Sequence, residues 1–322
     1  MKIAITGANG FLGSSFANFF HKLGHEVVGI IRPGADTSLL EGEIRLSETD
    51  YASPEAILSS LDGAEAVIHN AGKTRTRTFN EMIQANVGIT RNVLEVANLS
   101  GECKRFIYIS SQAASRPCEG LAEVTEEEKS TPVDWYGRSK VLAERMIRTE
   151  CARDWTIIRP ASVYGPGEKD FLQIFKAIKS GVNFRIGGGE RYFSLIHSGE
   201  LCEFIKLCLE KDEARNQLFF ASDGKAYSQT EFTALAEKLM GESPRNITIP
   251  LPLARAVFKG GDLFTRLTGK TTLINTQKGR EITRNWICSI DKARNLLGWD
   301  PRPDLEGNLK STLYWYARKG WL

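Results

Sequence analysis

A chain of 322 residues, with 42% hydrophobic and 25% charged residues, has the composition of a globular protein built as one large domain or two ordinary ones. Its formal net charge of +3 is too small to indicate a nucleic-acid partner. The four His and six Cys show no zinc-like spacing, and no stretch reaches the roughly 18 apolar residues of a transmembrane helix, so we expect neither a metal site nor a membrane span.

The first half of the chain alternates short apolar runs with helical patterns. The apolar runs predict strands at residues 2–6, 26–31, 44–46, 66–68, 106–109 and 155–158. Helical spacing and helix-start signals predict helices at residues 11–22, from Ser53 onward, at 79–99 and at 134–151. This alternation predicts an α/β fold, a Rossmann-type doubly wound parallel sheet that binds ligands at the carboxyl ends of its strands. Five polar residues fall at or just beyond those ends: Thr6, Arg32, Asn70, Ser110 and Arg159.

After about residue 165 the pattern becomes less regular. Helices are predicted at residues 170–180, 198–211, 229–240, 252–268 and 289–297. The region is too short and irregular for a second doubly wound sheet, so we expect a smaller mixed α/β lobe. We place a dinucleotide-binding Rossmann domain at residues 1–165 and a substrate-binding lobe at residues 166–322, some of whose segments return to the first domain.

Two features bear on the compartment. Met1 and Lys2 lead directly into a predicted buried strand, which is not the pattern of a removable leader. The cysteines contain no C-x-x-C pair, and we expect them to be reduced residues of the core: Cys103, Cys118, Cys151, Cys202, Cys208 and Cys288. A cytoplasmic protein is the expectation.

Three glycines follow the first predicted strand and open the first helix. In a dinucleotide cradle, Gly7 allows the tight turn, Gly10 lets the backbone approach a pyrophosphate, and Gly13 lets the helix pack close to the strand. The first turn of the helix then offers N–H donors to the phosphates. The spacing is G-x-x-G-x-x-G, and three glycines alone also suit a plain strand–turn–helix. We assign the cradle to Gly7, Asn9, Gly10, Phe11, Leu12 and Gly13.

The end of the second strand bears on the choice between the two nicotinamide cofactors. An enzyme that uses NAD usually places a carboxylate there, to bind the ribose 2′-hydroxyl. Here the place holds Ile31, followed by Arg32, and a guanidinium suits a 2′-phosphate. We therefore favour NADP(H), with NAD(H) as the alternative. In that alternative Arg32 is a solvated loop residue and Asp36 binds the hydroxyl.

Tyr136 and Lys140 lie one helical turn apart, so their side chains share a face. A hydride transfer needs a proton donor for the carbonyl oxygen, and a positive charge on Lys140 is expected to lower the pKa of the Tyr136 phenol. Ser111, just past the fifth strand, is suited to hydrogen-bond the substrate oxygen, with Ser110 as the competing candidate. Taken alone, Tyr136 and Lys140 also fit an ordinary pair of exposed side chains one turn apart on a surface helix.

These motifs together resemble the extended branch of the short-chain dehydrogenase/reductase superfamily, the NAD-dependent epimerase/dehydratase family. The resemblance covers the whole chain and is nearer to the 3β-hydroxysteroid-dehydrogenase and dihydroflavonol-reductase-like members. It implies catalytic roles for Ser111, Tyr136 and Lys140, with Lys140 also holding the nicotinamide ribose. The matching segments are residues 6–13, Asn70-Ala71-Gly72, Ser110-Ser111, Tyr136-x-x-x-Lys140, residues 159–167 and residues 297–301.

The resemblance also implies cofactor contacts outside the glycine cradle. Asp50 is expected to meet the adenine amino group, with the backbone of Tyr51 beside it, although Asp50 also suits a helix-leading cap. Asn70, Ala71 and Gly72 would line the adenine-ribose side. Pro160 and Val163 would pack near the nicotinamide carboxamide. A homodimer formed through the helices at 79–99 and 134–151 is implied as well.

Three departures from the family pattern bear on the substrate. Gln112-Ala113-Ala114 follow the serine where sugar-nucleotide dehydratases carry acidic residues, which argues against elimination chemistry. Ser162 stands where many sugar-nucleotide enzymes place an asparagine that faces the diphosphate. Phe193 stands where they place an arginine that binds the diphosphate. Arg191, two residues earlier, takes that role only if the alignment with the family shifts by two residues.

Two further segments have alternative interpretations. Residues 251–267 are rich in apolar side chains, which suits an amphipathic core helix or two short helices broken at Gly260-Gly261, and alternatively an apolar pocket wall or a membrane-facing patch. The basic segment from Lys73 to Arg77 suits either an anionic substrate tail or a solvated loop.

The leading hypothesis is therefore an NADP(H)-dependent oxidoreductase that acts on a carbonyl or secondary alcohol of a small, fairly apolar molecule. The first alternative is a nucleotide-sugar epimerase with permanently bound NAD. The second is a non-catalytic NADP(H)-binding sensor.

Overall fold

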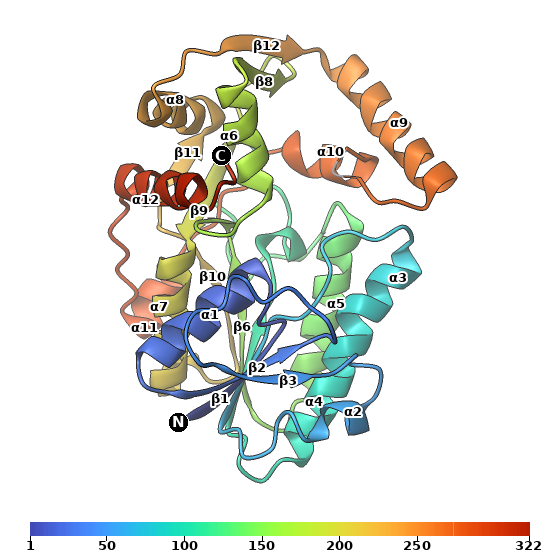
Figure 1. Cartoon of the computed structure of the whole chain (residues 1–322), viewed down its shortest axis with the longest axis vertical. Helices are drawn as coiled ribbons and strands as arrows, with labels where there is room; N and C mark the ends of the chain where they lie inside the picture. Colours follow the sequence, from blue (N-terminus) through green and yellow to red (C-terminus); the bar gives the residue numbers. More distant parts are fainter. Residues whose placement is uncertain (273) are drawn as a thin grey trace.

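The computed structural model describes residues 1–272 and 274–322, and a seven-stranded parallel sheet forms its centre (Figure 1). The strand order is β10-β6-β5-β4-β1-β2-β3, and every neighbouring pair is parallel. The order from β3 to β6 is that of a Rossmann fold, which confirms the predicted fold class. The strands are β1 (Lys2–Thr6), β2 (Glu26–Ile31), β3 (Arg45–Glu48), β4 (Ala66–His69), β5 (Arg105–Ile109), β6 (Asp154–Pro160) and β10 (Gln217–Ala221).

Helices cover both faces of this sheet because alternate side chains of each strand point to opposite faces. Ile3 and Ile5 of β1 pack on one side with Phe16 of α1 (Phe11–Lys22) and Phe204 of α7 (Ser198–Glu210). Ala4 packs on the other side, where the core is shared with α2, α4 and α5. The helices of that second face are α2 (Pro54–Leu58), α3 (Phe79–Ile83), α4 (Ile89–Leu99) and α5 (Trp135–Glu150).

The predicted helix at 79–99 is not continuous. A π-helical turn at Gln84–Gly88 separates α3 from α4. Asn86 lies in this turn, and its side chain bonds across to Lys73 and Ser139. The polar contacts of Asn86 come from segments distant in sequence, so helical periodicity alone does not reveal the interruption.

The second half of the chain builds a smaller lobe on the carboxyl edge of the sheet (Figure 1). It has a three-stranded sheet, β11-β9-β7, and a two-stranded sheet, β12-β8. The sequence predicted most of the helices here but missed every strand after β6, which are β7 to β12, and the helices α10 and α12. The elements are β7 (Ser162–Tyr164), α6 (Asp170–Lys179), β8 (Val182–Ile186), β9 (Tyr192–His197), β11 (Ala226–Ser228), α8 (Gln229–Met240), β12 (Arg245–Ile249), α9 (Leu251–Thr268), α10 (Thr276–Ile282), α11 (Asp291–Leu297) and α12 (Leu305–Arg318).

Two of these later elements lie in the first domain. β10 extends the parallel sheet beside β6, and α7 packs against α1. The predicted break at Gly260-Gly261 is wrong, because α9 is one helix from Leu251 to Thr268. A Cβ on Gly261 would lie 1.6 Å from the Ile274 carbonyl oxygen, so this glycine allows the following segment to pack directly on the helix.

A buried ion pair joins α5 to the sheet. The Arg159 guanidinium on β6 donates two hydrogen bonds to the Glu144 carboxylate, at 2.9 Å from Nε and 2.6 Å from Nη2. Ser110, just past β5, donates to the same carboxylate at 2.5 Å, and Arg159 also donates to Ser130. Both charged side chains are almost fully buried. Arg159 therefore serves the packing of α5 on β5 and β6.

A second buried network joins β1, β4 and α4 through His69. The Thr6 hydroxyl oxygen accepts from the N–H groups of Asn70 and Ala71, so its own proton faces His69 Nδ1 at 2.7 Å. His69 Nε2 then donates to Thr90 Oγ1 at 2.9 Å, and Thr90 donates to the Asn86 carbonyl. This arrangement requires a neutral imidazole, and burial lowers the pKa of His69 to about 3, with the Lys140 charge acting in the same direction.

We expect Arg159→Met to reduce the free energy of unfolding by about 3–5 kcal/mol, because the Glu144 carboxylate is left buried without its cation. Urea unfolding monitored by circular dichroism measures the change. The double variant Arg159→Met with Glu144→Leu should recover most of the loss, since it removes both charges. A double variant as unstable as the single one would contradict this account.

We also expect stability to fall with pH in a way that depends on His69. The folded pKa of His69, about 3, lies below its ordinary value, so the unfolded chain binds the proton more readily between about pH 6.5 and pH 3. Stability is then lost as pH falls through that window. Between pH 7 and pH 5 the loss in urea unfolding should be about 2 kcal/mol larger for the wild type than for His69→Gln. Equal losses in the two proteins would refute the assignment.

Candidate active site

The glycine cradle at the start of the chain is built from close backbone contacts. Gly7 has a φ of +67°, a conformation that favours glycine, and its N–H donates to the Ile30 carbonyl at 2.9 Å. A Cβ on Gly13 would lie 2.0 Å from the Gly7 carbonyl oxygen, so only glycine lets α1 start so close to β1. Gly10 is the N-cap of α1 and provides no side-chain cap, so no capping side chain competes with an anion for the N–H groups of the first turn. The cradle therefore fits a dinucleotide pyrophosphate.

Tyr51 supports this cradle in a way that the sequence did not suggest. Its side chain is buried, and its hydroxyl accepts from the Gly7 N–H at 3.1 Å and donates to the Ile30 carbonyl at 2.8 Å. Its backbone N–H donates to Thr49 Oγ1, so the backbone that was expected beside the adenine already has a partner. Burial raises the pKa of Tyr51 to about 12, which keeps the hydroxyl protonated.

The other predicted adenosine-side residues border the same loop. Asp50 is exposed, and its carboxylate accepts from the Ala52 N–H at 2.8 Å, while Ser53 caps α2. Ala71 lies directly against Gly7, since a Cβ on Gly7 would lie 3.0 Å from the Ala71 Cα. Asn70 and Gly72 flank Ala71 after the end of β4. Asp50 is thus not the helix cap that the sequence left open.

Arg32 and Asp36 follow the end of β2, and both are exposed. The Asp36 carboxylate accepts from the Ser38 N–H at 2.9 Å, and this bond lowers the pKa of Asp36. Pro160 ends β6 in the buried part of the sheet, and Val163 lies in β7 with its side chain partly buried against the core. The structure therefore leaves the Arg32 guanidinium accessible at the sheet edge.

The first turn of α5 brings the predicted catalytic residues together. A Cβ on Gly137 would lie 2.0 Å from the Ala113 carbonyl oxygen, so the glycine lets α5 pack on the short 3-10 turn at Gln112–Ala114. Asp134 caps the helix by accepting from the Gly137 N–H at 2.7 Å. Ser111, at the start of the 3-10 turn, thereby comes close enough to Tyr136 for its hydroxyl to act on the pKa of the phenol.

Lys140 lies beneath Tyr136 and is almost fully buried. Its Nζ is 5.7 Å from the Tyr136 ring centroid and donates to the Ile109 carbonyl at 2.7 Å. Burial lowers the pKa of Lys140 to about 8, while the Glu144 carboxylate acts in the opposite direction. The side chain is positioned by β5 and by the helix that carries it.

The pKa of Tyr136 moves in the direction opposite to our expectation. Burial raises it above its ordinary value, and the neighbouring Asp134 carboxylate adds to this effect. The hydrogen bond from Ser111 acts against both. Within the chain alone, Tyr136 is therefore held in its neutral, proton-donating form, and the Lys140 ammonium does not offset the cost of burial.

The two adjacent serines have different surroundings. Ser110 is buried, and its hydroxyl donates to Glu144. Ser111 is half-buried, and its hydroxyl oxygen accepts from the Ala113 N–H at 3.1 Å beside Tyr136. The Ser110 hydroxyl is therefore engaged by Glu144, whereas Ser111 is the serine beside Tyr136.

A cavity of about 820 Å³ opens beside Tyr136. Its walls come from the loop after β4, from α3, from the start of α5, and from α6, α9 and α10 of the lobe. Most of the lining residues are polar or charged, and the apolar side chains near Tyr136 are those of Phe79, Met82 and Trp135. This volume is within the range of small-molecule sites.

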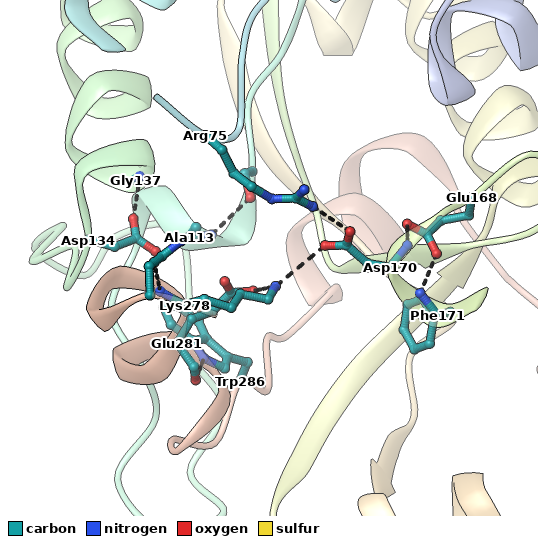
Figure 2. A network of polar contacts seen from close by, with 12 residues as sticks. Arg75, Ala113, Asp134, Gly137, Glu168, Asp170, Phe171, Lys278, Glu281 and Trp286 are labelled. Atoms are coloured by element: carbon teal, nitrogen blue, oxygen red, sulfur yellow. Dashed lines mark hydrogen bonds and ion pairs between the residues drawn. The ribbon is translucent and has the colours of Figure 1, made fainter. Parts of the chain in front are cut away.

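A chain of ion pairs crosses this cavity from the first domain to the lobe (Figure 2). The Arg75 guanidinium lies 2.5 Å from Asp170 Oδ1, and Lys278 Nζ lies 3.7 Å from Asp170 Oδ2 and 3.0 Å from Glu281. Arg77 pairs with Glu81 at 2.8 Å. The two arginines of the basic segment are thus paired with carboxylates. Their net charge is therefore too small to attract an anionic substrate tail, which was one of the two interpretations of this segment.

The residues considered as diphosphate ligands lie elsewhere. Arg191 lines a separate cavity of about 570 Å³ together with Arg116 and Arg284, and its Nη1 donates to the Glu190 carbonyl at 2.9 Å. Phe193 packs beside Phe232, with ring centroids 6.0 Å apart. Neither residue lines the 820 Å³ cavity beside Tyr136.

The apolar residues of α9 do not form a pocket wall, and the core-helix interpretation is also wrong for most of them. Leu253, Val257 and Leu267 are exposed by 56%, 47% and 77%, respectively. The helix instead contributes Asp262, Thr265 and Arg266 to the cavity beside Tyr136. Contacts with α10 decide this orientation, because a Cβ on Gly279 would lie 2.5 Å from the Phe258 ring.

Comparison with known proteins places these features in a family. The family model for the NAD dependent epimerase/dehydratase family matches residues 3–220. UDP-glucose 4-epimerase of Vibrio cholerae is 27% identical to this chain. The match covers 94% of that enzyme and 96% of this chain. Sterol-4-alpha-carboxylate 3-dehydrogenase of Dictyostelium discoideum is 25% identical, and the match covers 95% of that enzyme and 92% of this chain. Ceramide reductase of Caulobacter vibrioides is 26% identical, and the match covers 96% of that enzyme and 99% of this chain.

The solved structures agree on the fold. UDP-glucose 4-epimerase of Thermotoga maritima with UDP-glucose superimposes with a TM-score of 0.81 at 21% identity, over 99% of both chains. The family match spans the glycine cradle, the serines, Tyr136 and Lys140, and it confirms the resemblance seen in the motifs. The chain belongs to the NAD dependent epimerase/dehydratase family, in the extended branch of the short-chain dehydrogenases/reductases, and is an NAD(P)-dependent enzyme of that type.

Proposed function

We propose that this enzyme transfers a hydride between NADP(H) and a carbonyl or secondary alcohol whose polar end enters the 820 Å³ cavity while its remainder is apolar. The observation that carries the proposal is the position of Tyr136 at the wall of that cavity, with Lys140 buried behind its ring and Ser111 at the start of the adjoining 3-10 turn. The relatives named as a ceramide reductase and a sterol-carboxylate dehydrogenase support an oxidoreductase with an apolar substrate.

In this mechanism the chain's own groups handle the proton and the oxygen. The neutral Tyr136 hydroxyl donates its proton to the carbonyl oxygen, and the Ser111 hydroxyl hydrogen-bonds to the same oxygen. The buried Lys140 ammonium, close beneath the phenol ring, stabilises the phenolate that remains. The nicotinamide supplies or accepts the hydride when it is bound. The cradle from Gly7 to Gly13, the segment from Asn70 to Gly72, and Pro160 and Val163 would hold that cofactor.

A nucleotide-sugar epimerase is the second candidate, favoured by the 27% identity to the Vibrio cholerae enzyme. Such an enzyme would use the same three residues and return the hydride to the sugar. Against it, Ser162 stands at the asparagine position and Arg191 lines a different cavity from Tyr136. Absorbance and mass spectrometry of the purified protein, followed by NADPH oxidation with carbonyl lipids and by incubation with UDP-sugars, separate the two. Tightly retained NAD with sugar epimerisation would reject the reductase.

We further propose a homodimer formed through α3–α4 and α5, and a cytoplasmic location. Leu142 and Leu99 are exposed on these helices, which supports an interface there. All six cysteines are free thiols, which suits a reducing compartment. A stable monomer in gel filtration would reject the dimer.

Tyr136→Phe should reduce kcat by about 10²–10⁴-fold, because it removes the proton donor and leaves the ring in place. The dissociation constant of NADPH, measured by fluorescence titration, should change little. Tyr314→Phe, at an exposed position of α12, is the matched control and should retain full activity. A Tyr136→Phe enzyme that keeps its kcat would exclude this assignment of the proton donor.

Arg32→Asp should raise the dissociation constant of NADPH by about tenfold to a hundredfold, because it replaces a charge-assisted hydrogen bond to the 2′-phosphate by a repulsion. NADH binding should stay the same or tighten. Arg45→Asp is the control, since Arg45 is exposed at the opposite end of the neighbouring strand β3. Unchanged NADPH affinity in the Arg32→Asp variant would favour NAD(H) as the cofactor.

A further inference from the structure

The helix α9 has an unusual surface, because it exposes its apolar side. The inward stripe consists of Ala254, Phe258, Gly261, Asp262 and Thr265, which are buried or half-buried. The opposite stripe is exposed and almost wholly apolar, with members spaced three or four residues apart: Leu253, Ala256, Val257, Gly260, Leu263, Phe264 and Leu267. Figure 1 shows α9 at the outer edge of the lobe, with α10 on its inner side.

A third stripe of α9 is basic. Arg255, Lys259 and Arg266 are spaced for one side of the helix, and all three are exposed. The helix's one acidic residue, Asp262, faces inward and accepts hydrogen bonds from the N–H and hydroxyl of Thr276. The exposed surface of α9 is therefore apolar with a purely basic border.

We propose that α9 docks this enzyme onto an anionic lipid bilayer, with its apolar stripe among the acyl chains and its basic stripe at the phosphate groups. An apolar face bordered by Lys and Arg is the pattern of helices that lie in the plane of a membrane interface. The long basic side chains reach the headgroups while the helix body is immersed. No described helix is long and apolar enough to cross a bilayer.

Charge selects the bilayer over a second copy of the chain. A two-fold pairing of α9 with α9 would bring basic stripes together with no exposed carboxylate of the helix to match them. Anionic lipid headgroups match them directly. The strand β12, which leads into α9, adds exposed Ile247, with exposed Phe184 as its partner on β8.

The position of α9 connects the membrane with the reacting site. Asp262, Thr265 and Arg266 line the cavity that reaches Tyr136, while the apolar stripe of the same helix faces outward. Docking through α9 places that cavity beside the bilayer surface, so a membrane lipid could present its polar end to Tyr136 with its chains still in the membrane. This delivery role depends on the proposed function, whereas binding to the membrane does not.

Flotation with vesicles tests the docking, without cofactor or substrate. The wild type should float with vesicles of phosphatidylcholine and phosphatidylglycerol, and much less with phosphatidylcholine alone. Leu263→Glu should lower the partition coefficient by about tenfold or more, because an acyl-chain contact becomes a charge. Leu58→Glu on α2 is the matched control, since the two leucines are 56% and 57% exposed, and it should float like the wild type.

A second pair of variants tests the basic stripe. Arg255→Glu with Lys259→Glu should lose about tenfold or more of the binding to phosphatidylglycerol vesicles. Arg302→Glu with Lys310→Glu, beside and on α12, removes the same charge elsewhere and should change binding little. The proposal would be overturned if the wild type did not float, or if the control variants lost as much binding as the α9 variants. It would also be overturned if the protein bound no vesicles and Leu263→Glu instead dissociated a dimer. Protein that floats but reduces no carbonyl would reject the proposed function alone.

Discussion

The buried ion pair between Glu144 and Arg159 is the interaction on which the geometry of the active site depends. It joins the middle of α5 to β6, and Ser110 extends it to the end of β5. A buried ion pair of this kind contributes little more stability than a well-packed apolar pair, so its main consequence is position. Because Tyr136 and Lys140 lie on the same helix, this anchor sets their height above the carboxyl ends of β5 and β6.

Two glycines then bring the helix starts to the sheet edge. Gly13 allows α1 to approach the Gly7 carbonyl, and Gly137 allows α5 to approach the Ala113 carbonyl; at each position a Cβ would lie 2.0 Å from the oxygen. The first contact directs N–H donors toward the cofactor phosphates. The second brings Ser111 to the Tyr136 hydroxyl. The N-terminus of α1 and the side chain of Tyr136 therefore lie at the same edge of the sheet, because the backbones of α1 and α5 each approach a carbonyl oxygen unusually closely.

The lobe determines the electrostatic character of the cavity. The basic segment after β4 would give the cavity a positive edge by itself, but Asp170 of the lobe pairs with Arg75, and Glu81 of α3 in the first domain pairs with Arg77. Lys278 and Glu281 continue the ion pairs on α10 (Figure 2). The cavity is lined by charged side chains of both signs in nearly equal number, whereas the outer side of α9 is apolar. The two sides of α9 thus differ: its inner side lines the cavity beside Tyr136 with polar groups, and its outer side is an apolar surface.

The sequence alone determined the strand–helix alternation, the glycine cradle and the spacing of Tyr136 and Lys140. Each of these depends on residues within a few positions of one another, where periodicity and backbone sterics are decisive. It also indicated the amphipathic character of residues 251–267, but not which side of that helix faces inward.

Only the tertiary structure decided the features that depend on partners far apart in the chain. Arg75 meets Asp170 across 95 positions, and the Tyr51 hydroxyl meets Gly7 across 44. Ser110 donates to the buried Glu144 carboxylate, whereas Ser111 does not, and only this distant partner distinguishes the two serines. The apolar stripe of α9 faces outward because Phe258 of α9 packs against Gly279 of α10. Local patterns specify which groups are present, but burial and pairing with distant segments decide which of them stay available for chemistry or binding.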